Sequence, residues 1–215
     1  MLVGINGLIG SGKNTVGDYL VEEHKFIHDS FAKTLKDMTS VLMGWPRELL
    51  EGDTDESRLW REQVDEFWSK KLNIQDLTPR MTLQLLGTEV LRDNFSEGIW
   101  ISCVEKRLSE LKKETNVVIT DCRFSNEVNM IQQKNGILIK VKRGEDPEWW
   151  KDALAATDLG FVHAEKHKKI LEDKGIHITE WAWANTKFDY IVDNNGTLEE
   201  LHNTIDLIIM HERNR

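Results

Sequence analysis

The residues best suited to chemistry begin with a glycine-rich segment near the start of the chain. Residues 7–13 read Gly-Leu-Ile-Gly-Ser-Gly-Lys and fit the pattern G-x-x-x-x-G-K, between an apolar run at residues 2–6 and an amphipathic run at residues 13–23. Glycines let backbone N–H groups turn inward around phosphate oxygens, and the start of a following helix favours an anion there. Lys13 can then reach the β- and γ-phosphates of a nucleotide. We call residues 7–13 the glycine loop and predict that it binds phosphate.

The position after Lys13 departs from the usual form of this motif. Ser or Thr normally stands there and its hydroxyl binds Mg²⁺, whereas this chain has Asn14 followed by Thr15. The Asn14 amide oxygen and the Thr15 hydroxyl are both candidate ligands, and the sequence does not choose between them. Mg²⁺ is the expected cofactor because ATP arrives with it.

A second group of charged residues follows an apolar run at residues 116–121. Asp121 ends that run, where α/β folds place ligand-binding groups at the carboxyl edge of the sheet. Arg123 and Glu127 are four residues apart and share one helix face if the next helix begins early. A carboxylate can hold Mg²⁺, an arginine can grip phosphate, and a second carboxylate can orient that arginine. The alternative is a local ion pair that caps the helix, but with the glycine loop the group indicates phosphoryl transfer.

The elements that must position these groups alternate between strands and helices, which predicts a parallel α/β sheet. Strands are expected at residues 2–6, 26–28, 116–121, 137–143 and 188–192. Helices are expected at residues 13–23, 32–43, 83–91, 100–111, 126–134 and 198–210. A charged, aromatic stretch at residues 44–79 favours a helical insertion, and a polar stretch at residues 144–187 indicates a mobile arm. We predict one domain, residues 1–215, with a three-layer architecture.

Composition narrows the class of protein. The chain has 215 residues, 40% of them hydrophobic, and a net charge of −9, which describes a soluble globular protein with ample core. An acidic balance argues against duplex nucleic acid as a partner, and the absence of a long apolar run argues against a membrane. Two cysteines and a first segment unlike a signal peptide favour a cytoplasmic location. The oligomeric state stays open, with a homodimer among the alternatives.

With these residues in place, the sequence resembles the bacteriophage deoxynucleoside monophosphate kinases over most of the chain outside the insertion. The segments that carry the resemblance are residues 10–15 (GSGKNT), residues 86–89 (LGTE) with Asn94, Phe95 and Trp100, Asp121-x-Arg123-x-x-x-Glu127, residues 177–180 (HITE) and residues 194–200 (NNGTLEE). Their order and spacing are specific, although the family usually carries Asp at the place of Asn14. The resemblance implies a P-loop kinase fold that transfers the ATP γ-phosphate to a deoxynucleoside monophosphate (dNMP).

The resemblance also implies roles for individual residues. ATP would be bound by Gly10, Ser11, Gly12, Lys13, Asn14, Thr15 and a lid arginine, Arg143. The dNMP would be bound by Arg80 and Trp100. The catalytic group would be Lys13, Asp121, Arg123 and Glu127, and the metal ligands Asn14, Thr15 and Asp121. Residues 44–79 would bind the acceptor, residues 144–187 would form a lid-like arm, and a phage-encoded protein would act in the host cytoplasm.

Two other functions stay open on the sequence. One is a P-loop kinase with another small acceptor, such as dephospho-coenzyme A. The other is a binding module in which ATP only switches a partner surface, for which the acidic residues 53–66 are the candidate. The sequence also leaves open which bases are accepted and whether a ribose 2′-OH is rejected.

Overall fold

The structure, a computed structural model, describes residues 1–158, 160 and 162–215; residues 159 and 161, inside the arm predicted at residues 144–187, lie outside the described part. The chain divides into two compact units. The sheet unit comprises Met1–Ser30 and Leu111–Arg215, and the helical unit comprises Phe31–Glu110. In the part of the chain that the structure describes, no helix combines the length and apolarity needed to cross a membrane.

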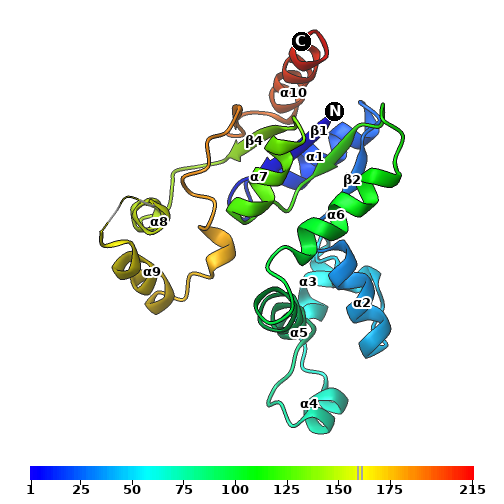
Figure 1. Ribbon diagram of the computed structural model, residues 1–215, viewed down its shortest axis with the longest axis vertical. Helices are drawn as coiled ribbons and strands as arrows, with labels where there is room; N and C mark the ends of the chain where they lie inside the picture. Colours follow the sequence, from blue (N-terminus) through cyan, green and yellow to red (C-terminus); the bar gives the residue numbers. More distant parts are fainter. Residues whose placement is uncertain (159, 161) are drawn as a thin grey trace. The chain divides into compact units, whose positions relative to one another are not determined.

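A five-stranded parallel sheet forms the centre of the sheet unit (Figure 1). Its strands are β1 (Leu2–Asn6), β2 (Ile27–Asp29), β3 (Val117–Ile119), β4 (Ile137–Lys142) and β5 (Tyr190–Asp193), in the spatial order β2-β3-β1-β4-β5. The central position of β1 explains its apolar sequence, because strands buried on both faces lack polar alternation. The predicted sheet is confirmed, and β3 ends at Ile119, so that Asp121 stands beyond the strand.

Helices cover both faces of the sheet, as a three-layer architecture requires. One face packs against α1 (Lys13–Glu22) and α10 (Leu198–Arg213). The shared core on that face includes Val3, Ile5, Ile139, Val141, Val16, Leu20, Leu201, Ile205 and Ile209. The other face packs against α7 (Ser125–Gln133), so closely that a Cβ on Gly4 would lie 2.5 Å from Ile131 Cδ1. A larger residue at this point of β1 would have to displace the side chains of Ile131 and Leu138.

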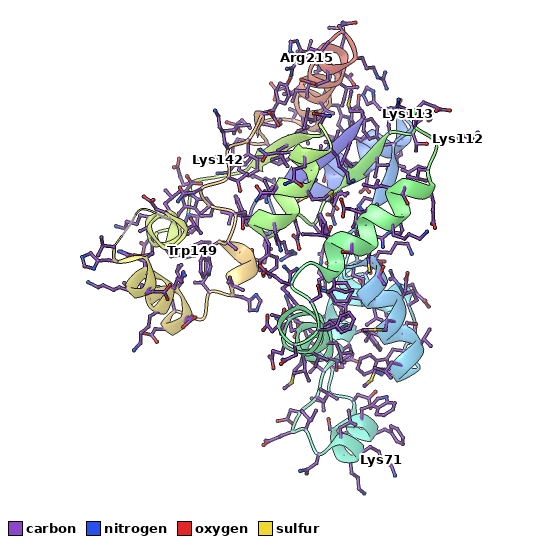
Figure 2. All side chains as sticks on the ribbon, in the orientation of Figure 1. Lys71, Lys112, Lys113, Lys142, Trp149 and Arg215 are labelled. Atoms are coloured by element: carbon purple, nitrogen blue, oxygen red, sulfur yellow. The ribbon has the colours of Figure 1, made fainter. Side chains whose placement is uncertain are left out.

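The segment predicted as an arm contains three short helices and a core of its own. These are α8 (Trp150–Thr157), α9 (Ala164–Asp173) and the 3₁₀ helix η3 (Ile178–Glu180). The core is rich in tryptophan and comprises Trp150, Ala153, Ala156, Leu171, Trp181, Trp183 and Ala184. The ammonium of Lys140, on β4, lies 4.8 Å from the centroid of the Trp150 ring. This cation–π contact links the core of the arm to the sheet. Figure 2 labels the neighbouring Trp149 beside α8.

The helical unit is built on α2 (Lys33–Met43) and α6 (Ile99–Glu110). Between them lie η1 (Glu48–Leu50), α3 (Asp55–Arg61), α4 (Glu66–Leu72), α5 (Pro79–Gln84) and η2 (Leu85–Asp93). A small core of Met43, Trp45, Leu50 and Leu77 lies under the connecting segments. The segment predicted as an insertion, residues 44–79, falls within this unit and contains η1, α3 and α4.

The helix expected at residues 83–91 differs from its prediction. The α-helix α5 ends at Gln84, and η2 continues as a π-helix. In η2, Gly87 is buried so close to Leu35 that a Cβ would lie 2.6 Å from Leu35 Cδ2. The indole Nε1 of Trp100 donates a hydrogen bond to the Gly87 carbonyl oxygen at 2.8 Å. The π-helix thus occurs where Leu35 and Trp100 contact Gly87. A sequence pattern with a period of 3.6 residues predicts an ordinary α-helix and does not record these contacts.

Candidate functional site

The glycine loop leads from β1 into α1 with a backbone that only glycine adopts easily. Gly7, Gly10 and Gly12 have φ angles of +151°, +78° and +100°. A Cβ on Gly7 would lie 2.4 Å from the Val141 carbonyl oxygen, and one on Gly12 would lie 2.3 Å from Asn194 Nδ2. The glycines thus permit the turn, and at Gly7 and Gly12 they also leave room for the Val141 carbonyl oxygen and the Asn194 side chain.

A side chain from the other end of the sequence holds the loop in place. Asn194, in the connection between β5 and α10, donates a hydrogen bond from Nδ2 to the Ser11 carbonyl oxygen at 2.9 Å. The Ser11 side chain is buried, and its Oγ has no hydrogen-bond partner among the described residues. Asn14 and Thr15 are exposed in the first turn of α1, where helix N–H groups lack partners within the helix. The start of α1 therefore offers donors to an anion.

Lys13 folds back onto the loop that precedes it. Its ammonium donates hydrogen bonds to the carbonyl oxygens of Gly7 at 2.7 Å and Leu8 at 2.8 Å. The pKa of Lys13 is lowered from 10.5 to about 8, chiefly because the side chain is buried and also because Arg123 is positively charged, while the negative charge of Glu180 partly opposes both effects. Because this pKa lies above 7, Lys13 is mostly protonated at neutral pH, and it loses its charge at a lower pH than an ordinary lysine does.

The carboxyl ends of β2 and β3 bring two further groups to the same region. Asp121 Oδ2 accepts a hydrogen bond from Ser30 Oγ at 2.7 Å. A pocket at this edge of the sheet is lined by Gly7, Ile9, Lys13, Thr120, Asp121, Cys122, Arg123, Thr179, Glu180 and Trp183. Three of the four predicted catalytic residues thus line one pocket with the glycine loop.

Arg123 and Glu127 interact differently from the way their spacing suggests. Because α7 begins at Ser125, Arg123 lies outside the helix, and Glu127 Oε2 accepts hydrogen bonds from the backbone N–H groups of Arg123 at 2.8 Å and Phe124 at 3.1 Å. The Arg123 guanidinium instead pairs with Glu180 of η3, with 3.1 Å between NH1 and Oε1. Glu127 therefore fixes the backbone that carries Arg123, and Glu180 holds its side chain.

The remaining predicted site residues lie elsewhere. Arg143 follows the end of β4, is exposed, and is not among the residues that line the pocket. Arg80 and Trp100 belong to the helical unit. Arg80 is half-exposed on α5 and forms an ion pair with Glu62, whereas Trp100 is 5% exposed and its indole N–H is bound to Gly87.

The donor groups at the loop suit Mg²⁺ that arrives with a nucleotide. No cluster of three or more His, Cys, Asp or Glu residues suited to a metal occurs among the described residues. Mg²⁺ is commonly bound through one or two carboxylates together with substrate phosphates and water. Asp121 supplies a carboxylate in the pocket, and Asn14 and Thr15 supply an amide oxygen and a hydroxyl at the start of α1. The chemistry of these oxygens fits Mg²⁺, and Asp121 is the one of the three residues that lines the pocket.

Sequence reasoning assigned no role to four residues at the site. Ser30 and Trp183 belonged to no motif, and Thr179 and Glu180 entered only as part of the segment at residues 177–180. One local signal existed for Ser30, because it directly follows β2 and so stands at the same sheet edge as Asp121. No local signal places η3 beside the pocket.

A family model and two viral proteins that match this chain all carry the description of a deoxynucleotide or deoxynucleoside monophosphate kinase. Residues 48–153 match the family model described as deoxynucleotide monophosphate kinase. A protein from Escherichia phage T5, described as deoxynucleoside-5'-monophosphate kinase, is 30% identical over 184 residues, which cover 63% of this chain and 73% of that protein. A protein of Acanthamoeba polyphaga mimivirus, whose name assigns it provisionally to the same activity, is 28% identical over 95% of this chain and 94% of its own length.

Among solved structures, dephospho-CoA kinase from Campylobacter jejuni aligns with a TM-score of 0.45 at 14% identity, over 98% of this chain and 96% of that chain. The identity to the phage T5 protein and the coverage of its length confirm the family predicted from the sequence. The chain belongs to the deoxynucleotide monophosphate kinase family.

Proposed function

We propose that this chain transfers the γ-phosphoryl group of ATP to a dNMP, releasing ADP and the deoxynucleoside diphosphate. The observation that carries the proposal is the pocket in which Lys13, Asp121 and Arg123 meet the glycine loop, in a chain of this family. Phosphoryl transfer spreads negative charge over the transferred group, and cations fixed around that group stabilise the transition state. Lys13 and Arg123 supply two such cations, and Asp121 supplies a carboxylate that can bind a metal ion.

Both substrates are anions, so the chain contributes chiefly by positioning them and offsetting their charge. N–H groups of the glycine loop and of the first turn of α1 would hold the ATP phosphates. Lys13 would exchange the Gly7 and Leu8 carbonyl oxygens for phosphate oxygens. Arg123 would offset charge on the transferred group, and Glu127 would keep the Arg123 backbone in register.

Asp121 would hold Mg²⁺, together with Asn14 or Thr15, and the ion would supply further neutralisation of the phosphate charge. The hydrogen bond from Ser30 Oγ leaves the Asp121 carboxylate oriented at the edge of the sheet. Of the two residues on α1, Thr15 carries the hydroxyl that the usual motif provides, and Asn14 carries the amide oxygen.

We assign the dNMP to the helical unit, with residues 44–79 as its binding segment. Arg80 is exposed, and its guanidinium would release Glu62 and bind the phosphate of the dNMP instead. Trp100 would act through the π-helix η2, whose Gly87 carbonyl it binds. Arg143 and the arm at residues 144–187 would close over ATP and exclude water, which otherwise competes as acceptor.

A coupled assay of ADP release tests the proposed function. ATP and Mg²⁺ are supplied with each dNMP in turn, with the matching ribonucleotides and dephospho-coenzyme A as separate arms. ADP release that depends on a dNMP is expected, and the panel ranks the bases and the sugar. Release with dephospho-coenzyme A alone, or ATP binding without transfer to any acceptor, would contradict the proposal and favour one of the two other functions. Light scattering after gel filtration tests the homodimer.

A further inference from the structure

The pocket contains a carboxylate that the proposed reaction does not use. Glu180 ends η3 and lines the pocket with Lys13 and Arg123. Its Oε1 lies 3.1 Å from Arg123 NH1, and its side chain is 19% exposed against 43% for Arg123. A carboxylate on the arginine of a phosphate site occupies a position that a phosphate oxygen would otherwise take.

The chain itself supplies acceptors to both cations of the pocket. Lys13 donates to the carbonyl oxygens of Gly7 and Leu8, and Arg123 donates to Glu180. A partly buried cation without an acceptor is unfavourable, and two cations in one pocket also repel each other. Both cations are therefore satisfied within the chain, and a phosphate ligand has to replace these acceptors.

We propose that Glu180 is the internal counter-ion of the phosphate site, which neutralises Arg123 while no phosphate is bound and yields the Arg123 NH1 group to a phosphate oxygen of the substrate. This inference rests on the proposed function only in requiring a phosphate-binding pocket, and not on the identity of the acceptor. Glu180 thus weakens anion binding, so that a ligand must carry enough phosphate charge to displace it. The expected ligand class is a polyphosphate.

The position of Glu180 also connects the phosphate site to the arm. Trp181 and Trp183, which follow it in the sequence, belong to the tryptophan-rich core of the arm, and Leu8 of the glycine loop packs against the same core. Displacement of the Glu180 carboxylate would therefore be transmitted to Trp181 and Trp183, which pack against residues of α8 and α9. The arm is bound to the phosphate site at Leu8 and at Glu180.

Binding of inorganic tripolyphosphate, measured by calorimetry without an acceptor, tests the proposal. Glu180→Gln keeps the size of the side chain and an oxygen for Arg123 NH1 but removes the charge. We expect it to bind tripolyphosphate about threefold more tightly than the wild type, a modest gain because Arg123 is partly solvated. Glu172→Gln changes an exposed residue of α9 by the same charge and should leave the affinity unchanged. Equal or weaker binding by Glu180→Gln, or no binding by either protein, would overturn the proposal.

A double-mutant cycle tests whether Glu180 acts through Arg123. In an Arg123→Gln background, Glu180→Gln should lose most of its gain in affinity, because the ion pair is already absent. An undiminished gain would overturn the assignment. Thermal unfolding of each variant verifies its fold, and Glu180→Asp provides a second variant, whose shorter side chain should give an intermediate gain.

The same preparations separate this inference from the proposed function. A wild-type chain that binds tripolyphosphate but phosphorylates no dNMP would contradict the proposed function, and the comparison with Glu180→Gln would still decide the role of Glu180. Unchanged tripolyphosphate affinity in a variant that retains dNMP-dependent ADP release would overturn the counter-ion alone.

Discussion

Lys13 Nζ lies 2.7 Å from the carbonyl oxygen of Gly7, the first residue of the glycine loop. The lysine of the motif therefore folds back onto its own loop. The same ammonium has to leave this carbonyl oxygen to reach a phosphate, so the two acceptors exclude each other. Several consequences of this arrangement, and of the contacts around it, are open to measurement.

Removal of the Lys13 ammonium should abolish most of the activity and leave the fold intact. Lys13→Ala is expected to lower kcat by about 10²–10³-fold, because one fixed donor to the developing charge is lost. Single-turnover ADP release measures the effect, with circular dichroism to verify the fold. Lys113→Ala, an exposed lysine labelled in Figure 2, serves as the control and should retain full activity. Normal turnover in Lys13→Ala would exclude the mechanism.

Activity should fall as the pH rises above about 8. Lys13 has a pKa of about 8, so it is protonated below that pH and loses the charge that attracts ATP above it. The value of kcat/KM for ATP reports the free enzyme and should decline up to tenfold per pH unit on the alkaline side. Lys13→Arg should remove this decline, since a guanidinium stays charged. A wild-type profile that is flat to about pH 9.5 would contradict the assignment.

Loss of the Asn194 side chain should affect ATP and spare the acceptor. Asn194→Ala removes the hydrogen bond to the Ser11 carbonyl oxygen, and the net value of one such bond corresponds to a rise of about fivefold in KM for ATP. Steady-state kinetics with varied ATP and varied dNMP separate the two constants. Asn203→Ala, on the exposed side of α10, should change neither. An equal rise in both KM values would indicate general destabilisation instead.

Dependence on Mg²⁺ should respond in opposite directions to two substitutions. Asp121→Asn removes the pocket carboxylate and should raise the Mg²⁺ concentration that gives half-maximal activity. Asn14→Asp adds a carboxylate at the start of α1 and should lower that concentration, by about fivefold if the new oxygen reaches the ion. Titration of Mg²⁺ at constant ATP measures both, with Asp173→Asn on α9 as the control. The same Mg²⁺ requirement in all three variants would remove Asp121 and Asn14 from the metal site.

Trp100 should matter for stability and for the acceptor. Trp100→Phe removes the donor to the buried Gly87 carbonyl oxygen and should lower the free energy of unfolding by about 1–3 kcal/mol. Because η2 is disturbed, KM for the dNMP should rise while KM for ATP stays constant. Denaturant unfolding and kinetics measure the two effects. Trp60→Phe is the matched control in the helical unit, since Trp60 is half-buried and shows a ring contact with Trp45. An unchanged KM for the dNMP would contradict the role of η2.

The sequence alone predicted the strands of the sheet and the helices that flank it, but not the helices of the arm. The helix predicted at residues 13–23 is α1 at Lys13–Glu22, and the closing helix predicted at residues 198–210 is α10 at Leu198–Arg213. These features were predictable because glycine spacing, apolar periodicity and helix caps act within a few residues. The same local logic selected Lys13, Asp121 and Arg123 as site candidates, and these three residues line one pocket.

Tertiary structure alone decided which partners these residues have. Glu180 is 57 positions from Arg123, Ser30 is 91 from Asp121, and Asn194 is 183 from Ser11. Spacing of four residues pointed instead to Glu127 as the partner of Arg123, and that interpretation failed for the side chain because α7 begins only at Ser125. The order of strands in the sheet and the packing of the arm bring these distant segments together. Such contacts depend on the whole fold, because no local pattern records which strand ends become neighbours.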